Sequence, residues 1–134
     1  MKLRPHHIYC FHILGLTDAD RGKDYMNVRS EIARRFIDEE GEIEVNEGPD
    51  MLCTPCTYYD GTGCTHPRGD ETQVRKWDAR ILQGLGIEYG QTIGIGDMKR
   101  LMKNRMPLDF CLSRCPYSKT RTCDPCKLPG YFQM

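Results

Sequence analysis

The sequence lacks a long apolar run. A helix that spans a membrane needs about 18 consecutive apolar residues, whereas the longest apolar stretch here, residues 8–16, is interrupted by His12 and Gly15. The first seven residues contain two histidines and two basic residues in place of the apolar segment of an export signal. We therefore expect a chain that does not span a membrane and that resides in the cytoplasm.

A strong net charge is also absent, because 19 basic residues balance 19 acidic ones. The charges are nevertheless unevenly placed. Residues 38–50 carry seven acids and no base, and residues 97–134 carry eight bases against three acids. We interpret the acidic run as a solvated helix end and hairpin edge. The basic tail is interpreted as an offset to the negative charge of thiolate-bound metal, so nucleic acid is not the expected partner.

Cysteine, in contrast, is abundant, with eight residues in a chain of 134. Seven of them form two runs, and each run contains a close pair, a third cysteine eight positions later and a Cys-x-Pro-Cys step. Disulfide scaffolds belong mainly to secreted chains, whereas clustered thiols in a reducing compartment are more often metal ligands. The pattern therefore predicts metal sites. The two runs are Cys53, Cys56 and Cys64, and Cys111, Cys115, Cys123 and Cys126.

The ligand type restricts the metal. Ligation by cysteine alone favours soft centres and argues against calcium or magnesium. Eight thiols make two four-cysteine sets, which suits either one or two 4Fe-4S clusters or two zinc ions. The spacing of the cysteines does not discriminate between iron–sulfur and zinc.

A His-His-x-x-Cys segment near the N-terminus supplies the eighth cysteine. His6 and His7 lie four and three residues before Cys10, so the three side chains share one face if this segment is helical. The alternative is a buried cysteine beside two histidines that bond to backbone carbonyls. We predict one site formed by Cys10, Cys53, Cys56 and Cys64, with both histidines nearby, and a second formed by Cys111, Cys115, Cys123 and Cys126. A competing arrangement joins Cys53 and Cys56 to Cys123 and Cys126, and His66 is a weaker ligand candidate.

The periodicity of apolar residues predicts a single small domain over residues 1–134, mostly α with a short β edge and irregular cysteine-rich loops. Helices are expected at residues 6–14 behind Pro5, at 24–39, from about residue 70 to Gly84 or Gly86, and after Asp97 as N-cap. A further helical turn is expected at Pro107. Residues 42–46 alternate like a strand, and residues 90–96 are expected to be irregular.

These motifs together resemble a known family, domain of unknown function 1284, whose small microbial members are suspected of binding iron–sulfur clusters. The resemblance covers residues 3 to about 123 and implies an iron–sulfur protein without implying a reaction. Two features depart from the family pattern, namely Ile8-Tyr9 in a usually leucine-rich segment and the additional Cys126. The matching motifs are Arg4-Pro5-His6-His7-x-x-Cys10, Gly22-Lys23-x-Tyr25, Gly48-Pro49-Asp50-x-x-Cys53-x-x-Cys56 with Cys64, and Asp78-x-x-Ile81-Leu82-x-x-Leu85-Gly86.

No catalytic set can be identified in the sequence. The glycines of residues 90–96 lack a phosphate-binding Lys-Ser/Thr step or a complete dinucleotide motif, so we do not expect an enzyme by itself. Two functional classes remain. The first is an iron–sulfur protein that transfers electrons to an unidentified redox or protein partner, or that senses redox or iron state. The alternative is a small α domain that a zinc ion holds together and that binds a protein or a nucleic acid. Nucleic acid is the less expected partner, because the pattern of basic residues interleaved with aromatic ones is weak.

Overall fold

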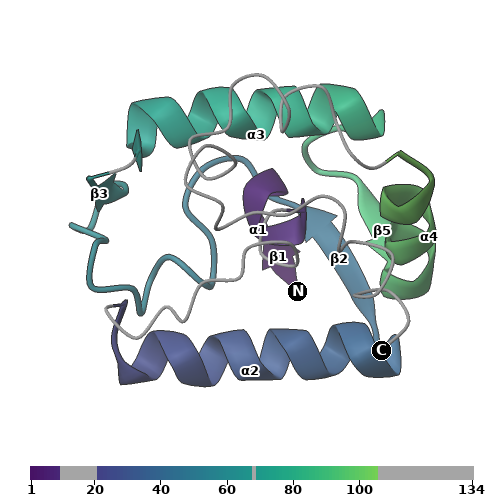
Figure 1. Ribbon diagram of the computed structural model, residues 1–134, viewed down its shortest axis with the longest axis horizontal. Coiled ribbons are helices and arrows are strands. Elements are labelled where there is room, and N and C mark those ends of the chain that lie inside the picture. Colours follow the sequence, from purple (N-terminus) through teal and green to yellow (C-terminus); the bar gives the residue numbers. More distant parts are fainter. Residues whose placement is uncertain (10–20, 68, 106–134) are drawn as a thin grey trace.

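Two long helices define the shape of the protein in the computed structural model, which describes residues 1–9, 21–67 and 69–105. Helix α2 (Lys23–Asp38) and helix α3 (Glu71–Leu85) lie along opposite sides of the molecule, with the short helix α1 (Pro5–Tyr9) between them (Figure 1). The mostly α fold with short β elements is confirmed. The prediction of one domain extends beyond the described residues and stays a prediction.

The two long helices follow local signals in the sequence. Helix α3 begins after Asp70, whose carboxylate accepts a hydrogen bond from the backbone N–H of Gln73 at 3.1 Å, and ends at Gly86 in the left-handed conformation. Helix α2 ends at Glu39, which adopts the same conformation. Each helix buries an apolar stripe, and all of these side chains except Val74 belong to one core. The stripes contain Tyr25, Ile32 and Phe36 in α2 and Val74, Ile81 and Leu85 in α3.

A three-stranded sheet connects the N-terminus to the helices. Strand β2 (Glu42–Val45) is central, pairing in parallel with β1 (Lys2–Leu3) and antiparallel with β5 (Thr92–Gly94). The predicted strand at residues 42–46 is therefore confirmed. The expectation of an irregular segment at residues 90–96 was wrong, because Thr92–Gly94 forms a strand that pairs with β2. The glycines of this segment do not indicate a strand, since the strand depends on its tertiary pairing with β2.

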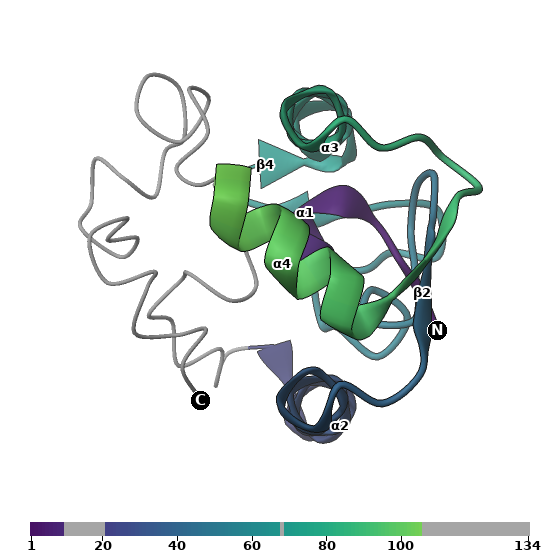
Figure 2. The ribbon, with the colours of Figure 1, turned by 90° about the vertical axis from the view of Figure 1, so that its right-hand side faces the viewer.

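Helix α4 (Ile95–Arg105) packs against both long helices (Figure 2). It buries Ile95, Met98 and Met102 in the core. The prediction that Asp97 caps its N-terminus was wrong. The chain passes directly from β5 into the helix at Ile95, so Asp97 lies in the first turn. No helix in the described part of the chain is both long and apolar enough to cross a membrane.

A two-stranded ribbon attaches the cysteine loop to α3. Strand β3 (Thr65–His66) pairs antiparallel with β4 (Gly69–Asp70), which leads directly into the helix. A Cβ atom at Gly69 would lie 2.2 Å from the ring of Trp77, so only glycine allows the ribbon to approach α3 this closely. The ribbon thereby fixes Cys64 next to the N-terminus of α3.

Candidate metal centre

Three cysteines separated by up to eleven positions border the same small pocket. Cys53 and Cys56 come from the turn that follows β2, and Cys64 immediately precedes β3. All three are free thiols. The cavity measures about 30 Å³, which exceeds the space that one water molecule requires. The three described cysteines of the first predicted site thus border one pocket, but within the described residues their sulfurs do not form a group with the spacing of a metal site.

Asp50 shapes the turn that carries two of these thiols. One carboxylate oxygen of Asp50 accepts hydrogen bonds from the backbone N–H groups of Leu52 at 2.9 Å and Cys53 at 3.1 Å. The other oxygen accepts the backbone N–H of Arg4 at 2.7 Å. Asp50 thus joins the cysteine loop to the N-terminal segment, which explains how these two segments, distant in sequence, form one wall of the pocket.

Arg4 lies at the centre of the polar network, and its side chain has no exposed surface. Its Nε donates to Asp78 at 2.8 Å, and its two terminal nitrogens donate to the two oxygens of Glu71 at 3.0 and 2.8 Å. Its Nη1 also lies 3.7 Å from Sγ of Cys53. Burial alone would lower the pKa of Arg4, but its hydrogen bonds to the two carboxylates raise it above its ordinary value, so the group stays charged.

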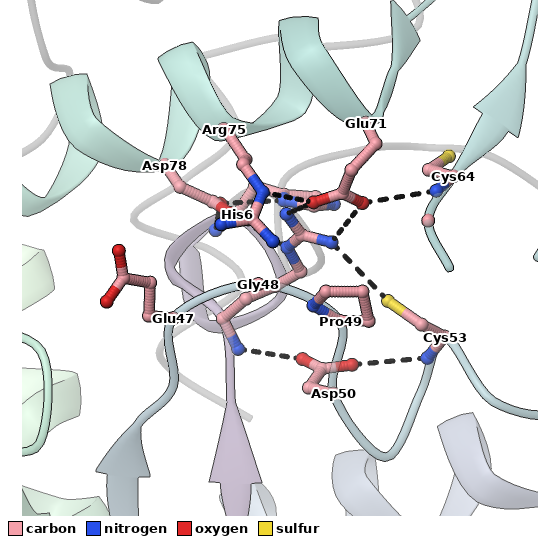
Figure 3. A network of polar contacts seen from close by, with 12 residues as sticks. His6, Glu47, Gly48, Pro49, Asp50, Cys53, Cys64, Glu71, Arg75 and Asp78 are labelled. Carbon is pink, nitrogen blue, oxygen red and sulfur yellow. Dashed lines mark hydrogen bonds and ion pairs between the residues drawn. The ribbon is translucent and has the colours of Figure 1, made fainter. Parts of the chain in front are cut away.

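Glu71 extends this network to the third cysteine. Figure 3 shows its carboxylate between the buried guanidinium group and the backbone N–H of Cys64, which donates at 3.1 Å. Arg75 donates to the same carboxylate from the solvent side at 2.8 Å. Burial opposes ionisation of Glu71, but the hydrogen bonds from Arg4 lower its pKa. The ion pair of Arg4 and Glu71 therefore contacts two cysteines. Arg4 contacts the sulfur of Cys53, and Glu71 accepts the backbone N–H of Cys64.

Both histidines of α1 border the pocket, and each is held by a buried carboxylate. Nδ1 of His6 lies 2.8 Å from Asp78, and Nδ1 of His7 lies 2.8 Å from Asp50. The two rings are 4.2 Å apart between centroids. Burial, with a smaller effect of His7, lowers the pKa of His6, so its imidazole is neutral at physiological pH. The alternative expectation, that the histidines bond to backbone carbonyls, does not describe these contacts.

Burial acts differently on the carboxylate of Asp50 and on the thiols of Cys53 and Cys64. Burial disfavours the charged form of Asp50, but His7 and the N–H of Arg4 lower its pKa below the ordinary value. Burial and the charge of Asp50 raise the pKa of Cys53 to about 12, and burial also raises the pKa of Cys64. An incoming metal ion must displace protons from these sulfurs, because thiolate is the form that binds metal.

Aromatic residues and a second arginine form the remaining wall of the pocket. Nη1 of Arg21 lies 3.8 Å from Sγ of Cys56, and its guanidinium carbon lies 5.7 and 5.5 Å from the ring centroids of Tyr25 and Tyr58. Two of the three sulfurs therefore each have one arginine N–H within hydrogen-bonding range. Donors of this kind stabilise negative charge on metal-bound sulfur.

One group of side chains in the described residues has the spacing of a metal site. A ring nitrogen of His7, a carboxylate oxygen of Asp50 and Sγ of Cys53 lie within 4.8 Å of one another. The donor set of the pocket, three thiols with imidazole nitrogens beside them, is that of a soft or borderline metal. The residues present are thus compatible with a bound metal ion, although they do not identify it.

Sequence reasoning missed the carboxylates that build the site. The interpretation of residues 38–50 as a solvated acidic run was wrong for Asp50, whose side chain is fully buried. Asp78 and Glu71 were not predicted as site residues either. An aspartate three residues before Cys53 is a local capping signal, but nothing local indicates the partners of Arg4. Cys10, Cys111, Cys115, Cys123, Cys126 and Pro107 lie outside the described residues.

A family model described as protein of unknown function (DUF1284) matches residues 22–127. The chain belongs to this family. The match begins after α1, so it covers the three pocket cysteines but not His6, His7 or Cys10, and it extends as far as Cys126. No curated protein and no solved structure matches the chain. Membership of the family therefore assigns no activity.

Proposed function

We propose that this protein binds an iron–sulfur cluster through Cys53, Cys56 and Cys64, and that it uses the cluster to transfer single electrons or to sense redox state. The observation that carries the proposal is that all three cysteines border one pocket, with an arginine N–H beside each of two sulfurs. Hydrogen bonds to sulfur and burial are among the factors that set the potential of such a cluster. The three cysteines hold the iron, and the cluster supplies the one-electron chemistry.

A four-ligand centre needs one group beyond these three thiols. Cys10 stays the sequence-based prediction for that position, and the described pocket residues offer a second candidate. The predicted second site, Cys111, Cys115, Cys123 and Cys126, also stays a prediction. Either a redox partner or a protein that reads the state of the cluster would complete the function, and no contact in the described residues identifies it.

The decisive experiment is analysis of protein purified without oxygen for iron, sulfide and zinc, together with its visible absorbance. We expect iron and sulfide in similar amounts and a broad charge-transfer absorbance. Cys56→Ser should lower the iron content, whereas Thr54→Ser, a change in the same turn that keeps the hydroxyl group bonded to Asp50, should not. Stoichiometric zinc in a colourless anaerobic sample would contradict the iron–sulfur proposal.

Zinc is the second candidate, and one observation favours it. Two histidines border the pocket beside the three thiols, and thiolate with imidazole is a common zinc ligand set. In this case the metal would stabilise the small α domain, whose surface would bind a partner protein. The same elemental analysis distinguishes the two candidates.

A further inference from the structure

Asp50 is part of the only group with metal-site spacing in the described residues, yet its oxygen atoms are already used. They accept three backbone N–H groups, those of Arg4, Leu52 and Cys53, at 2.7 to 3.1 Å. They also contact Nδ1 of His7 at 2.8 and 3.0 Å. A carboxylate offers about four acceptor positions, so Asp50 has no capacity left for a metal ion. Asp50 therefore orients its neighbours and is not itself a metal ligand.

The contact to Asp50 determines which nitrogen of His7 is available. Because the carboxylate of Asp50 accepts hydrogen bonds, the neutral tautomer of His7 that fits this contact has its proton on Nδ1 and its lone pair on Nε2. No hydrogen bond to Nε2 of His7 occurs within the described residues, while the ring borders the pocket with the cysteines. Imidazoles that ligate a metal almost always donate their second ring N–H to a carboxylate or carbonyl in this way.

We propose that Nε2 of His7 is a direct ligand of the metal, so that the centre has a mixed imidazole and thiolate ligand set with His7 in the position predicted for Cys10. Asp50 then orients two ligands at once, since it holds the ring of His7 and the backbone of Cys53. The inference deepens the proposed function and rests on it, because it concerns the metal of the same pocket.

The separation of these groups is compatible with shared ligation. Bond lengths of about 2.1 Å to nitrogen and 2.3 Å to sulfur at a tetrahedral angle place the two ligand atoms about 3.6 Å apart. One ring nitrogen of His7 and the sulfur of Cys53 lie within 4.8 Å of each other. Nε2 is the ring nitrogen that Asp50 does not contact, and the ring borders the same pocket as Cys53. An imidazole in place of one thiolate also makes a cluster less negative and raises its potential.

His6 provides the matched comparison. It precedes His7 on the same helix, borders the same pocket and has its own buried carboxylate, Asp78. Asp78, however, belongs to α3 and holds Arg4, and His6 does not belong to a ligand group with any cysteine in the described residues. The proposal therefore assigns ligation to His7 and not to His6.

The test is a ¹H–¹¹³Cd correlation spectrum of the full chain loaded with ¹¹³Cd²⁺. The chain has only four histidines, which makes their ring protons assignable. We expect one cadmium resonance that couples to the ring protons of His7 and to the β-protons of Cys53, Cys56 and Cys64. His7→Asn, whose amide nitrogen can still donate to Asp50, should abolish the imidazole coupling and weaken cadmium binding about 10- to 100-fold. His6→Asn should retain the coupling to His7.

The outcomes separate this inference from the proposed function. Cadmium that couples to the three cysteines but not to His7 would overturn the inference and leave the metal site of the pocket standing. The inference would also fail if β-protons of Cys10 replaced the ring protons of His7 on that resonance. Cadmium that couples to none of the three cysteines would overturn both proposals. The spectrum of the unmodified chain decides among these outcomes even if a variant fails to fold.

Discussion

Arg4 and Arg21 place positive charge beside Cys53 and Cys56, but their surroundings differ. Arg4 is fully buried and forms ion pairs with Glu71 and Asp78, so its removal would leave carboxylates unpaired inside the protein. Arg21 is half-buried and stacks near Tyr25. Replacing Arg21 therefore tests the effect of a sulfur contact with less damage to the core.

We expect Arg21→Gln to weaken metal binding in the pocket about tenfold, because outer contacts to ligands typically contribute this much. The physical reason is the loss of a charged donor 3.8 Å from Sγ of Cys56. Competition with a chromophoric chelator measures the affinity. Arg34→Gln, which removes an exposed arginine that pairs with acids on the surface, is the control and should leave the affinity unchanged. Equal affinities for the Arg21 and Arg34 variants would show that the contact to sulfur is unimportant.

Helix α3 supplies both carboxylates that bind the side chain of Arg4, since Glu71 and Asp78 lie on it, seven residues apart. Seven residues are about two helical turns, which aligns the two carboxylates on the face toward Arg4. Asp70 and Gly86 cap the two ends of this helix. The stability of these ends therefore bears directly on the pocket.

At Gly86 the backbone φ angle is 69°, and a Cβ atom there would meet nothing closer than 4.0 Å. Gly86→Ala should thus lower the free energy of unfolding by about 1 kcal/mol through backbone strain alone. Urea denaturation of the metal-free protein measures the change. Gly94→Ala is the comparison, because Gly94 does not require the left-handed conformation and a Cβ atom there has ordinary contacts. We expect it to cost less than about 0.5 kcal/mol, and a larger loss at Gly94 would refute this explanation.

The separation of elements in sequence explains what could and could not be predicted. Helix α3 was predictable because its stripe and both of its capping residues are local. Strand β5 was not, because it forms only against β2, about fifty residues earlier. The cysteines and histidines could be identified by their spacing. Their carboxylate partners could not, since Arg4 contacts Asp78 across 74 positions and His7 contacts Asp50 across 43.

At the scale of the whole molecule, the buried pair of Arg4 and Asp78 joins the N-terminal segment to α3. We expect Asp78→Asn to lower the free energy of unfolding at neutral pH by about 3 kcal/mol, because it removes one partner of a buried ion pair. Denaturation in urea measures this loss. Asp97→Asn, which alters an exposed pair on α4, should change stability by less than about 0.5 kcal/mol.

The same ion pair should make the stability of the protein depend on pH in the acidic range. Burial opposes the charge of Asp78, but His6 and Arg4 lower its pKa below the ordinary value of 3.8. The folded state therefore holds fewer protons than the unfolded state near that value, so this contribution to stability is present above pH 3.8 and is lost as the pH falls below it. Urea denaturation of the metal-free protein at several acidic pH values should show a shallower loss for Asp78→Asn than for the unaltered chain. Parallel curves would contradict this assignment.

The contacts of Arg4 also bear on the biosynthesis of the protein. Its partners lie 67 and 74 residues further along the chain, so on the ribosome the pocket has no complete wall until α3 has been made. Cys53, Cys56 and Cys64 leave the ribosome before Glu71 and Asp78 do, and for that interval the two carboxylates that hold the side chain of Arg4 are not yet in place. Metal captured at this stage would meet a flexible peptide and not the finished site. If the pocket binds metal as proposed, loading would depend on delivery after synthesis, or on protection of the nascent thiols until α3 folds against the N-terminal segment.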